Sequence, residues 1–170
     1  MATGYDAEFL DFAEASRTRL RRTAFLMCGD WERASDITQE ALIRLYVAWP
    51  RIDKGAGLSS YARRTVVSIA IDWSRRKSSS ELPDADLDGG RFADPTDGIA
   101  DRITILNALA TLAPRQRACV VLRYYEDLSV AEVARMLGCR EGTVKSQTAR
   151  ALDTLRKILG DLSLTEEAAS

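Results

Sequence analysis

The residues best suited to chemistry form a polar and basic cluster in the last third of the chain: Arg140, Lys145, Ser146 and Arg150. Side chains of these types donate hydrogen bonds to phosphate oxygens and to base edges in the major groove of DNA. The N-terminus of a helix that carries them also favours phosphate through its free N–H groups. The cluster therefore predicts a helix that enters the major groove.

The segment that must position this cluster has the pattern of a helix-turn-helix. Ser129 and Glu132 have the spacing of a capping box, which satisfies free N–H groups where a first helix begins. Gly138 follows where a helix end favours a positive φ, and Val144 is placed to fill the angle between the two helices. Together with the small Ala134, this pattern favours DNA binding over an ordinary helical hairpin with a solvated basic face. The expected apolar faces comprise Val130, Val133, Ala134 and Leu137 in the first helix, and Leu152, Leu155 and Leu159 in the second.

Composition argues against an enzyme. The chain contains no histidine, which removes histidine bases, histidine metal sites and Ser-His nucleophile pairs. It also lacks a Gly-rich phosphate loop and a pair of carboxylates in an apolar setting. We therefore expect no catalytic residue, no metal and no other cofactor.

Cysteine usage and hydropathy indicate a cytoplasmic protein. Cys28, Cys119 and Cys139 are far apart in the sequence, which suggests reduced thiols rather than a disulfide framework or a zinc site. Cys28 and Cys119 are expected to be packing residues. No apolar run approaches the roughly 18 residues of a membrane-spanning helix, and the acidic N-terminus lacks an apolar signal core, so we expect no membrane insertion.

The net charge of −1 conceals a strong division along the chain. Residues 1–77 carry 13 basic and 10 acidic residues, and residues 102–160 carry 10 basic and 5 acidic residues. Residues 78–101, in contrast, carry 1 basic and 7 acidic residues. Basic blocks on either side of an acidic connector indicate a polyanionic partner, and the Ser, Asp, Gly and Pro content of the connector is typical of a linker. We expect an all-α chain with two small helical domains at 1–77 and 98–160, a flexible acidic linker at 78–97 and a disordered tail at 161–170.

Apolar residues recur at helical spacing in both blocks, and no strand pattern stands out. We expect Asp30 to cap the second helix, Pro50 to end it, and Pro114 to be the first residue of a helix in the second block, after another helix near 98–111. The side chains expected to face inward are Phe9, Phe12, Ala13, Leu20, Ala24 and Met27; Ala34, Ile37, Ala41, Leu45 and Trp49; Ala62, Val66, Ile69, Ala70 and Trp73; and Ala118, Val121, Leu122 and Tyr125.

Three short motifs add a family resemblance. They are DITQEAL at 36–42, IDWSRR at 71–76, and LAPRQR at 112–117 followed by GTVKS at 142–146. In this order and at these distances they resemble region 2 and region 4 of the bacterial sigma factors of the extracytoplasmic function family, over about residues 8–160. The resemblance implies a promoter-specificity subunit of RNA polymerase that recognises −35 and −10 elements and promotes DNA melting in the bacterial cytoplasm.

By that resemblance, the partners are promoter DNA and core RNA polymerase, through its β′ clamp helices and β flap. The sequence leaves open whether an anti-sigma factor also binds. Asp36, Gln39, Glu40 and Arg44 would face the clamp helices, and the spacing is compatible because 36, 40 and 44 share a helix face. The alternative is that Glu40 and Arg44 only form an i,i+4 surface pair.

The resemblance places the −10 element against the third helix and the loop before it. Tyr61 and Trp73 would stack on unpaired bases, although the apolar-face position of Trp73 favours core packing instead. Ser68 stands where many relatives have an asparagine beside the flipped base. The residues implied at the −10 element are Tyr61, Arg63, Arg64, Ser68, Asp72, Arg75 and Arg76.

The resemblance places the −35 element against the helix-turn-helix. Arg123 precedes it and would hold backbone phosphate, the alternative being a solvated arginine. Gln147 stands where arginine is frequent and Ala149 where a larger side chain is frequent, which suggests fewer contacts. The residues implied at the −35 element are Arg123, Arg140, Lys145, Ser146, Gln147 and Arg150.

Two other function classes remain open from the sequence. A self-sufficient helix-turn-helix transcription regulator would form a stable dimer on a palindromic site without polymerase. A helical adaptor that binds only protein would keep its function after Lys145→Ala and Arg150→Ala.

Overall fold

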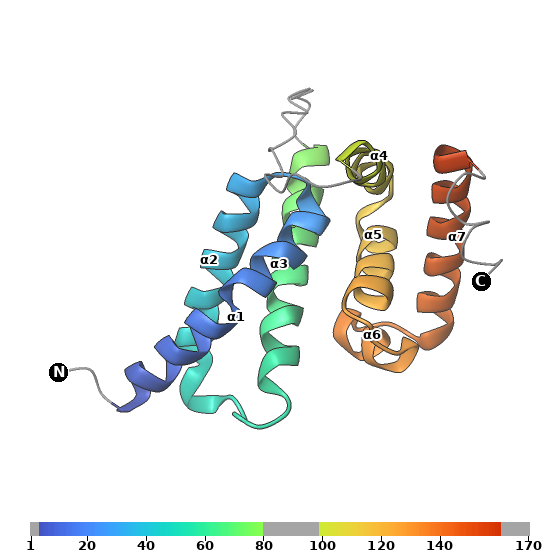
Figure 1. Ribbon diagram of the computed structural model, residues 1–170. Helices are drawn as coiled ribbons and strands as arrows, with labels where there is room; N and C mark the ends of the chain where they lie inside the picture. The colour runs from blue at the N-terminus through green and yellow to red at the C-terminus, as the bar shows by residue number, and fades with distance from the viewer. Residues whose placement is uncertain (1–3, 80–98, 161–170) are drawn as a thin grey trace, which may run out of the picture. The chain divides into compact units, whose positions relative to one another are not determined.

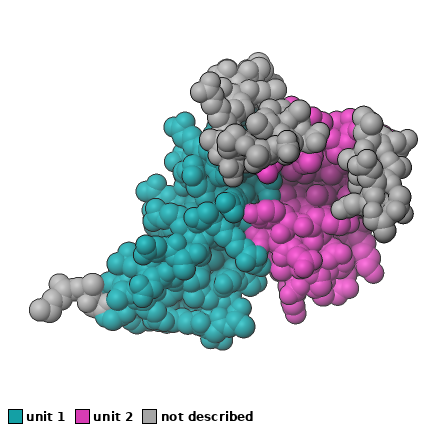
Figure 2. Space-filling model, in the orientation of Figure 1, with its two compact units in different colours: residues 1–85 teal, residues 86–170 magenta. Residues whose placement is uncertain are grey.

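The computed structural model describes residues 4–79 and 99–160, which belong to two compact units at 1–85 and 86–170 (Figure 2). Every regular element among the described residues is helical, which confirms the predicted all-α class with two small helical domains. Unit 1 contains α1 (Gly4–Cys28), α2 (Trp31–Ala48), the short 3-10 helix η1 (Trp49–Arg51) and α3 (Leu58–Ser79) (Figure 1). Unit 2 contains α4 (Ile99–Ala110), α5 (Pro114–Val120), the π-helical turn η2 (Val121–Tyr125), α6 (Val130–Leu137) and α7 (Glu141–Leu159).

The predicted linker and tail fall mostly outside this description. Only residues 78 and 79 of the predicted linker are described, and they still belong to α3. The helix therefore runs two residues past the boundary expected from composition. The tail at 161–170 lies wholly outside the described residues.

The turn between α1 and α2 follows directly from its sequence. Gly29 has a φ of 76°, and its N–H donates to the carbonyl oxygen of Phe25 at 2.7 Å, which closes α1. The Asp30 carboxylate then accepts from the backbone N–H groups of Glu32 at 2.8 Å and Arg33 at 3.3 Å. This confirms the expected N-cap.

The core of unit 1 lies where α1, α2 and α3 pack against one another. Its inner faces are lined by small and β-branched side chains, so the three backbones approach closely. The residues of this core that are at most 1% exposed are Thr23, Ala24, Ala34, Ala41, Leu45, Trp49, Ala62, Val66, Val67 and Ala70. The expected inward set is largely confirmed, except that Phe9, Phe12 and Trp73 are only half-buried.

An aromatic cluster fixes the end of α2. Trp49 is 1% exposed, and the ring of Phe9 meets it edge-on with centroids 5.2 Å apart. Phe12 lies 5.5 Å from the same indole, and Pro50 follows in η1, where α2 cannot continue. The N-terminal turns of α1 are thereby attached to the segment that leads into α3.

Unit 2 is organised around the expected helix-turn-helix. The Ser129 side chain accepts from the Glu132 N–H at 3.2 Å, and the Glu132 carboxylate accepts from the Ser129 N–H at 2.7 Å, so both halves of the capping box form. Gly138 ends α6 in the left-handed region with a φ of 63°. Val144 is fully buried and Ala134 is 5% exposed, which confirms the close crossing of α6 and α7.

The expectation that Tyr125 faces inward is wrong, because its side chain is 45% exposed. The helix that begins at Pro114 widens into a π turn over Val121–Tyr125, where the Glu126 N–H donates to the carbonyl oxygen of Val121 at 3.0 Å. An i to i−5 bond adds a residue to the turn and rotates the side chains after it around the helix axis. The inward register predicted for an ordinary α-helix is therefore lost after Leu122.

Candidate nucleic-acid and protein interfaces

The α7 helix presents the predicted polar cluster on its outer side. Lys145, Ser146 and Arg150 are all exposed, while Val144 and Ala151 are the residues that α7 buries. The Ser146 hydroxyl donates to the carbonyl oxygen of Thr143 at 3.1 Å, which leaves its lone pairs toward solvent. Since these side chains follow the first turn of α7, they are arranged as a recognition helix requires.

The other three residues predicted at the −35 element occupy different positions. Arg140 is exposed at the N-cap of α7, ahead of the helix itself, and Gln147 is half-buried. The Arg123 guanidinium donates to the carbonyl oxygen of Leu128, so it fastens the turn that precedes α6. Arg123 therefore has a partner within unit 2, and its contact with phosphate stays a prediction.

The α3 helix gathers most of the residues predicted at the −10 element. Spacings of three and four residues place them on one exposed face. The members of this stripe are Tyr61, Arg64, Ser68, Asp72 and Arg75. Arg76 is exposed beside it, whereas Arg63 is half-buried on another side of the helix and is not brought together with the rest.

The α2 helix exposes all four residues predicted to face polymerase: Asp36, Gln39, Glu40 and Arg44. The Arg44 guanidinium donates to the Glu40 carboxylate at 2.5 Å, with both side chains 51% exposed. The i,i+4 pair that formed the alternative interpretation is thus present. Such a pair contributes little to stability, so it leaves both residues available to a partner.

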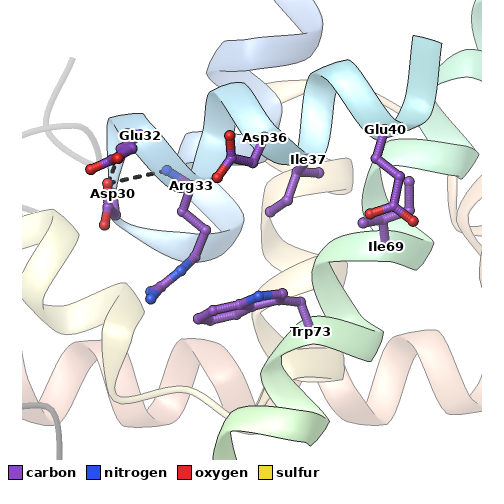
Figure 3. A pocket seen from close by; sticks show the side chains of 8 residues that line it. All are labelled: Asp30, Glu32, Arg33, Asp36, Ile37, Glu40, Ile69 and Trp73. Carbon is purple, nitrogen blue, oxygen red and sulfur yellow. Dashed lines mark hydrogen bonds between the residues drawn. The ribbon is translucent and has the colours of Figure 1, made fainter. Parts of the chain in front are cut away.

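A pocket of about 400 Å³ lies between α2 and α3 (Figure 3). Ile37, Ile69 and Trp73 form its apolar part, and the Arg33 guanidinium lies 3.5 Å from the centroid of the Trp73 ring. The Trp73 side chain is therefore a half-buried pocket wall covered by a cation, rather than the core residue that its helix position favoured. The carboxylates that line the pocket are Asp30, Glu32, Asp36 and Glu40.

The sequence analysis did not predict that the exposed face of α2 with Asp36 and Glu40 continues with apolar side chains. Ile43 is 57% exposed and Val47 is 72% exposed, and both continue the spacing set by Asp36 and Glu40. A signal was available: once positions 34, 37, 41 and 45 are assigned inward, these two side chains must point outward. Exposed apolar side chains beside acidic ones are typical of a protein-binding surface.

The Cys119 thiol adds no reactive group to these surfaces. Burial, with a smaller effect of the nearby Cys139, raises the pKa of Cys119 to about 11 against smaller lowering effects of Arg115 and Thr148. Cys119 is 1% exposed, which confirms its expected packing role. Cys28 is half-buried at the end of α1.

The surfaces are those of a helix-turn-helix protein whose unit 1 also exposes an acidic and apolar face on α2. Comparison with known proteins agrees with this class. The family model for sigma-70 region 2 matches residues 12–80, and that for sigma-70 region 4 matches residues 102–155.

Two curated relatives extend the match over nearly the whole chain. The RNA polymerase sigma-E factor of Streptomyces antibioticus is 38% identical over 164 residues, which cover 95% of this chain and 91% of that protein. The ECF RNA polymerase sigma factor SigW of Bacillus subtilis is 30% identical, with coverages of 91% and 90%. The chain belongs to the extracytoplasmic function family of sigma-70 RNA polymerase sigma factors and is a promoter-recognising subunit of RNA polymerase.

Solved structures share the fold. The sigma factor RpoE of Bartonella quintana, solved with the anti-sigma factor NepR, matches with a TM-score of 0.72 at 23% identity and covers 91% of this chain and 98% of that one. CnrH, solved with the cytosolic domain of CnrY, matches with a TM-score of 0.68 at 18% identity, with coverages of 94% and 92%. Among residues 4–79 and 99–160, no helix has the length and apolarity needed to cross a membrane.

Proposed function

We propose that the two units divide promoter recognition, with α7 of unit 2 at the −35 element and α3 of unit 1 at the −10 element. The observation that carries this proposal is the exposed set of Lys145 and Ser146 near the start of α7 and Arg150 at its middle, after a fully formed capping box and a left-handed Gly138. Lysine and arginine at that position contact guanine edges or phosphates, and serine contacts either.

On α3, the exposed stripe supplies what a melted −10 element needs. Tyr61 offers a ring on which an unpaired base stacks, and Arg64 and Arg75 offer charge to the phosphates of the same strand. Ser68 and Asp72 lie between them and would select bases through hydrogen bonds. Arg63, which is half-buried off this stripe, has the weakest support of the predicted set.

Core polymerase would bind along α2, where Asp36, Gln39 and Glu40 are exposed, through the clamp helices of its β′ subunit. The acidic character of this face favours a partner that presents basic side chains. Unit 2 would meet the β flap. The chemistry of RNA synthesis belongs to the polymerase, and we assign no enzymatic activity to this chain.

A third partner class follows from the solved relatives. RpoE was solved with an anti-sigma factor and CnrH with the cytosolic domain of CnrY, and we propose that a protein of the anti-sigma class also binds this chain and competes with polymerase for the α2 face. Copurification from native cells, before and after added core polymerase, tests this competition. A regulator that stays bound to the holoenzyme would contradict it.

The test of the main proposal is run-off transcription with core polymerase on the DNA upstream of the protein's own gene, with and without the protein. We expect a discrete new transcript, whose start site locates both promoter elements. Sequence-specific footprinting by the protein alone on a palindromic site, without any transcript, would instead favour a dimeric regulator.

A further inference from the structure

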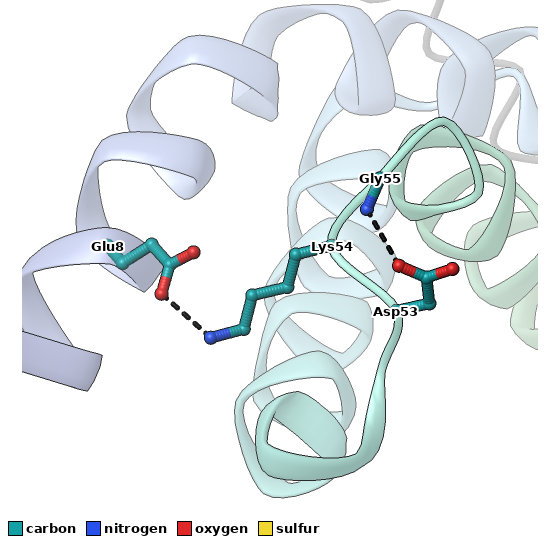
Figure 4. Close-up of polar contacts among 4 residues, drawn as sticks. All are labelled: Glu8, Asp53, Lys54 and Gly55. Atoms are coloured by element: carbon teal, nitrogen blue, oxygen red, sulfur yellow. Dashed lines mark hydrogen bonds and ion pairs between the residues drawn. The ribbon is translucent and has the colours of Figure 1, made fainter.

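The loop before α3, at residues 52–57, is attached to the first turns of α1. The Lys54 ammonium donates to the Glu8 carboxylate, with Nζ and Oε2 2.7 Å apart, across 46 positions of sequence (Figure 4). The same ammonium lies 4.3 Å from the centroid of the Tyr5 ring and 5.4 Å from that of Trp49. One side chain of the loop thus contacts a carboxylate and two aromatic rings from other elements.

An exposed ion pair by itself contributes little, so the aromatic surroundings decide whether this contact holds the loop. The Lys54 side chain is 30% exposed, against 51% for Glu8, which shows that the cation is the better covered partner. Trp49 is 1% exposed and is fixed by Phe9, so the surface under Lys54 is rigid. A cation over a fixed ring and beside a carboxylate is held from two sides.

The other bonds of the loop are local. The Asp53 carboxylate accepts from the Gly55 N–H at 3.1 Å, and the Leu58 N–H donates to the carbonyl oxygen of Gly55 at 3.2 Å. The Tyr61 N–H donates to the carbonyl oxygen of Gly57 at 2.9 Å. These bonds shape the turn and connect it to the first turn of α3, but they do not attach it to α1.

We propose that the N-terminal turns of α1 position the loop before α3 for contact with the −10 element. Glu8 and Tyr5 are the positioning residues, and they act through Lys54 on the loop and on Tyr61. The inference rests on the proposed role of α3 at the −10 element. A loop that is already fixed when DNA arrives does not have to lose conformational freedom on binding. We call the contact between Glu8, Tyr5 and Lys54 the tether. Its loss therefore weakens promoter opening and leaves polymerase binding unchanged.

The experiment compares three variants in the reconstituted holoenzyme: Glu8→Gln, Lys54→Met and the charge exchange Glu8→Lys with Lys54→Glu. Opening is measured as permanganate reactivity of thymines at the −10 element, and polymerase binding as copurification. We expect opening to fall about fivefold in Glu8→Gln and about tenfold in Lys54→Met, which also loses the cation over the rings. The charge exchange restores the ion pair but not the cation over the rings, so we expect its opening to exceed that of Lys54→Met and to stay below that of the unmodified protein.

Asp6→Ala is the matched control, because the Asp6 carboxylate lies in the same turn of α1 but accepts from the Tyr46 hydroxyl on α2, at 2.8 Å. We expect its opening to match that of the unmodified protein. Opening that is equal in Glu8→Gln and the unmodified protein, or a charge exchange no better than Lys54→Met, would overturn the inference. The second result would mean that the ion pair with Glu8 does not hold the loop.

Two further variants separate this inference from the proposed function on which it rests. Tyr61→Ala and Arg64→Ala should lower opening whether or not the tether exists. If they do so while Glu8→Gln does not, only the tether is wrong; if they leave opening unchanged, the −10 assignment falls and the tether with it. Tryptophan fluorescence verifies that each variant is folded, since Trp31, Trp49 and Trp73 all lie in unit 1.

Discussion

The two units differ in the sequence range of the contacts that shape their functional surfaces. In unit 2, the capping box joins residues three apart, and one glycine turns the chain toward α7. In unit 1, the Glu8–Lys54 ion pair joins residues 46 apart. A surface built on short-range signals can be predicted from a sequence pattern, whereas one built on long-range packing cannot.

This difference also affects what each surface can recognise. The side of α7 that we assign to DNA is one face of one helix, so its composition can be listed from spacing alone. The pocket of unit 1 needs α2 and α3 together, because Arg33 from one covers Trp73 from the other. Variants in the two units should therefore fail in different ways.

The largest effect is expected from Trp49→Ala, which removes the indole that joins α1, η1 and the loop before α3. Truncating a side chain that is 1% exposed should lower the free energy of unfolding of unit 1 by about 3–5 kcal/mol. Urea unfolding followed by tryptophan fluorescence measures unit 1, since all tryptophans lie there, and Leu10→Ala at an exposed site of α1 is the control. Equal midpoints for the two variants would show that the aromatic cluster does not hold unit 1.

Next in size are Lys145→Ala and Arg150→Ala, which test the local surface of unit 2. Each should weaken promoter use by about 1–3 kcal/mol if the contact is to a base, or evenly across promoter sequences if it is only to phosphate. Run-off transcription on a set of −35 variants distinguishes the two cases, with Lys157→Ala at an exposed site in the last turn of α7 as control. Unchanged transcription in both variants would remove the −35 assignment.

Glu40→Arg tests whether the exposed acidic face of α2 in unit 1 binds polymerase. Reversing this charge breaks the pair with Arg44 and places a cation where a basic partner is expected, so polymerase affinity should fall by about 1–2 kcal/mol. Binding to immobilised core polymerase measures it, and Glu14→Arg is the matched charge reversal at an exposed site of α1. Normal affinity in Glu40→Arg would show that the acidic α2 face is only a solvated surface.

The smallest effect is expected from alanine substitutions at two glycines of unit 2, Gly138 and Gly142. A Cβ on Gly138 or on Gly142 would meet nothing within 4 Å, but only Gly138 has a positive φ. Gly138→Ala should therefore cost about 1 kcal/mol of stability, whereas Gly142→Ala inside α7 should be neutral or slightly stabilising. Circular dichroism during urea unfolding detects the difference, while the fluorescence transition of unit 1 stays fixed. Equal costs would mean that the turn does not depend on a left-handed residue.

Features that depend on short-range contacts were predicted correctly, and features that depend on packing between elements were not. The caps at Asp30 and Ser129, the turn at Gly138 and the buried Val144 were predictable, because each depends on residues within one or two helical turns. Tyr125 was misplaced because a π turn depends on how α5 packs rather than on its apolar spacing.

Trp73 shows the limit for the candidate site. Its position on α3 favoured the core, and nothing within α3 predicts that Arg33, forty positions earlier, covers its ring. The hydrogen bond from Arg123 to the carbonyl oxygen of Leu128 was likewise not predicted, and its expected phosphate contact stays a prediction. In both cases the partner was chosen by the packing of neighbouring elements.

The sequence by itself determined the all-α class, the two blocks, the helix-turn-helix and the family, since helical periodicity, capping and motif spacing are properties of neighbouring residues. Only the tertiary structure decided that Lys54 is held by Glu8 and two aromatic rings, and that α2 and α3 enclose a pocket. The physical reason is that side-chain contacts between distant segments depend on how the helices cross and rotate against one another, which helical periodicity leaves undetermined.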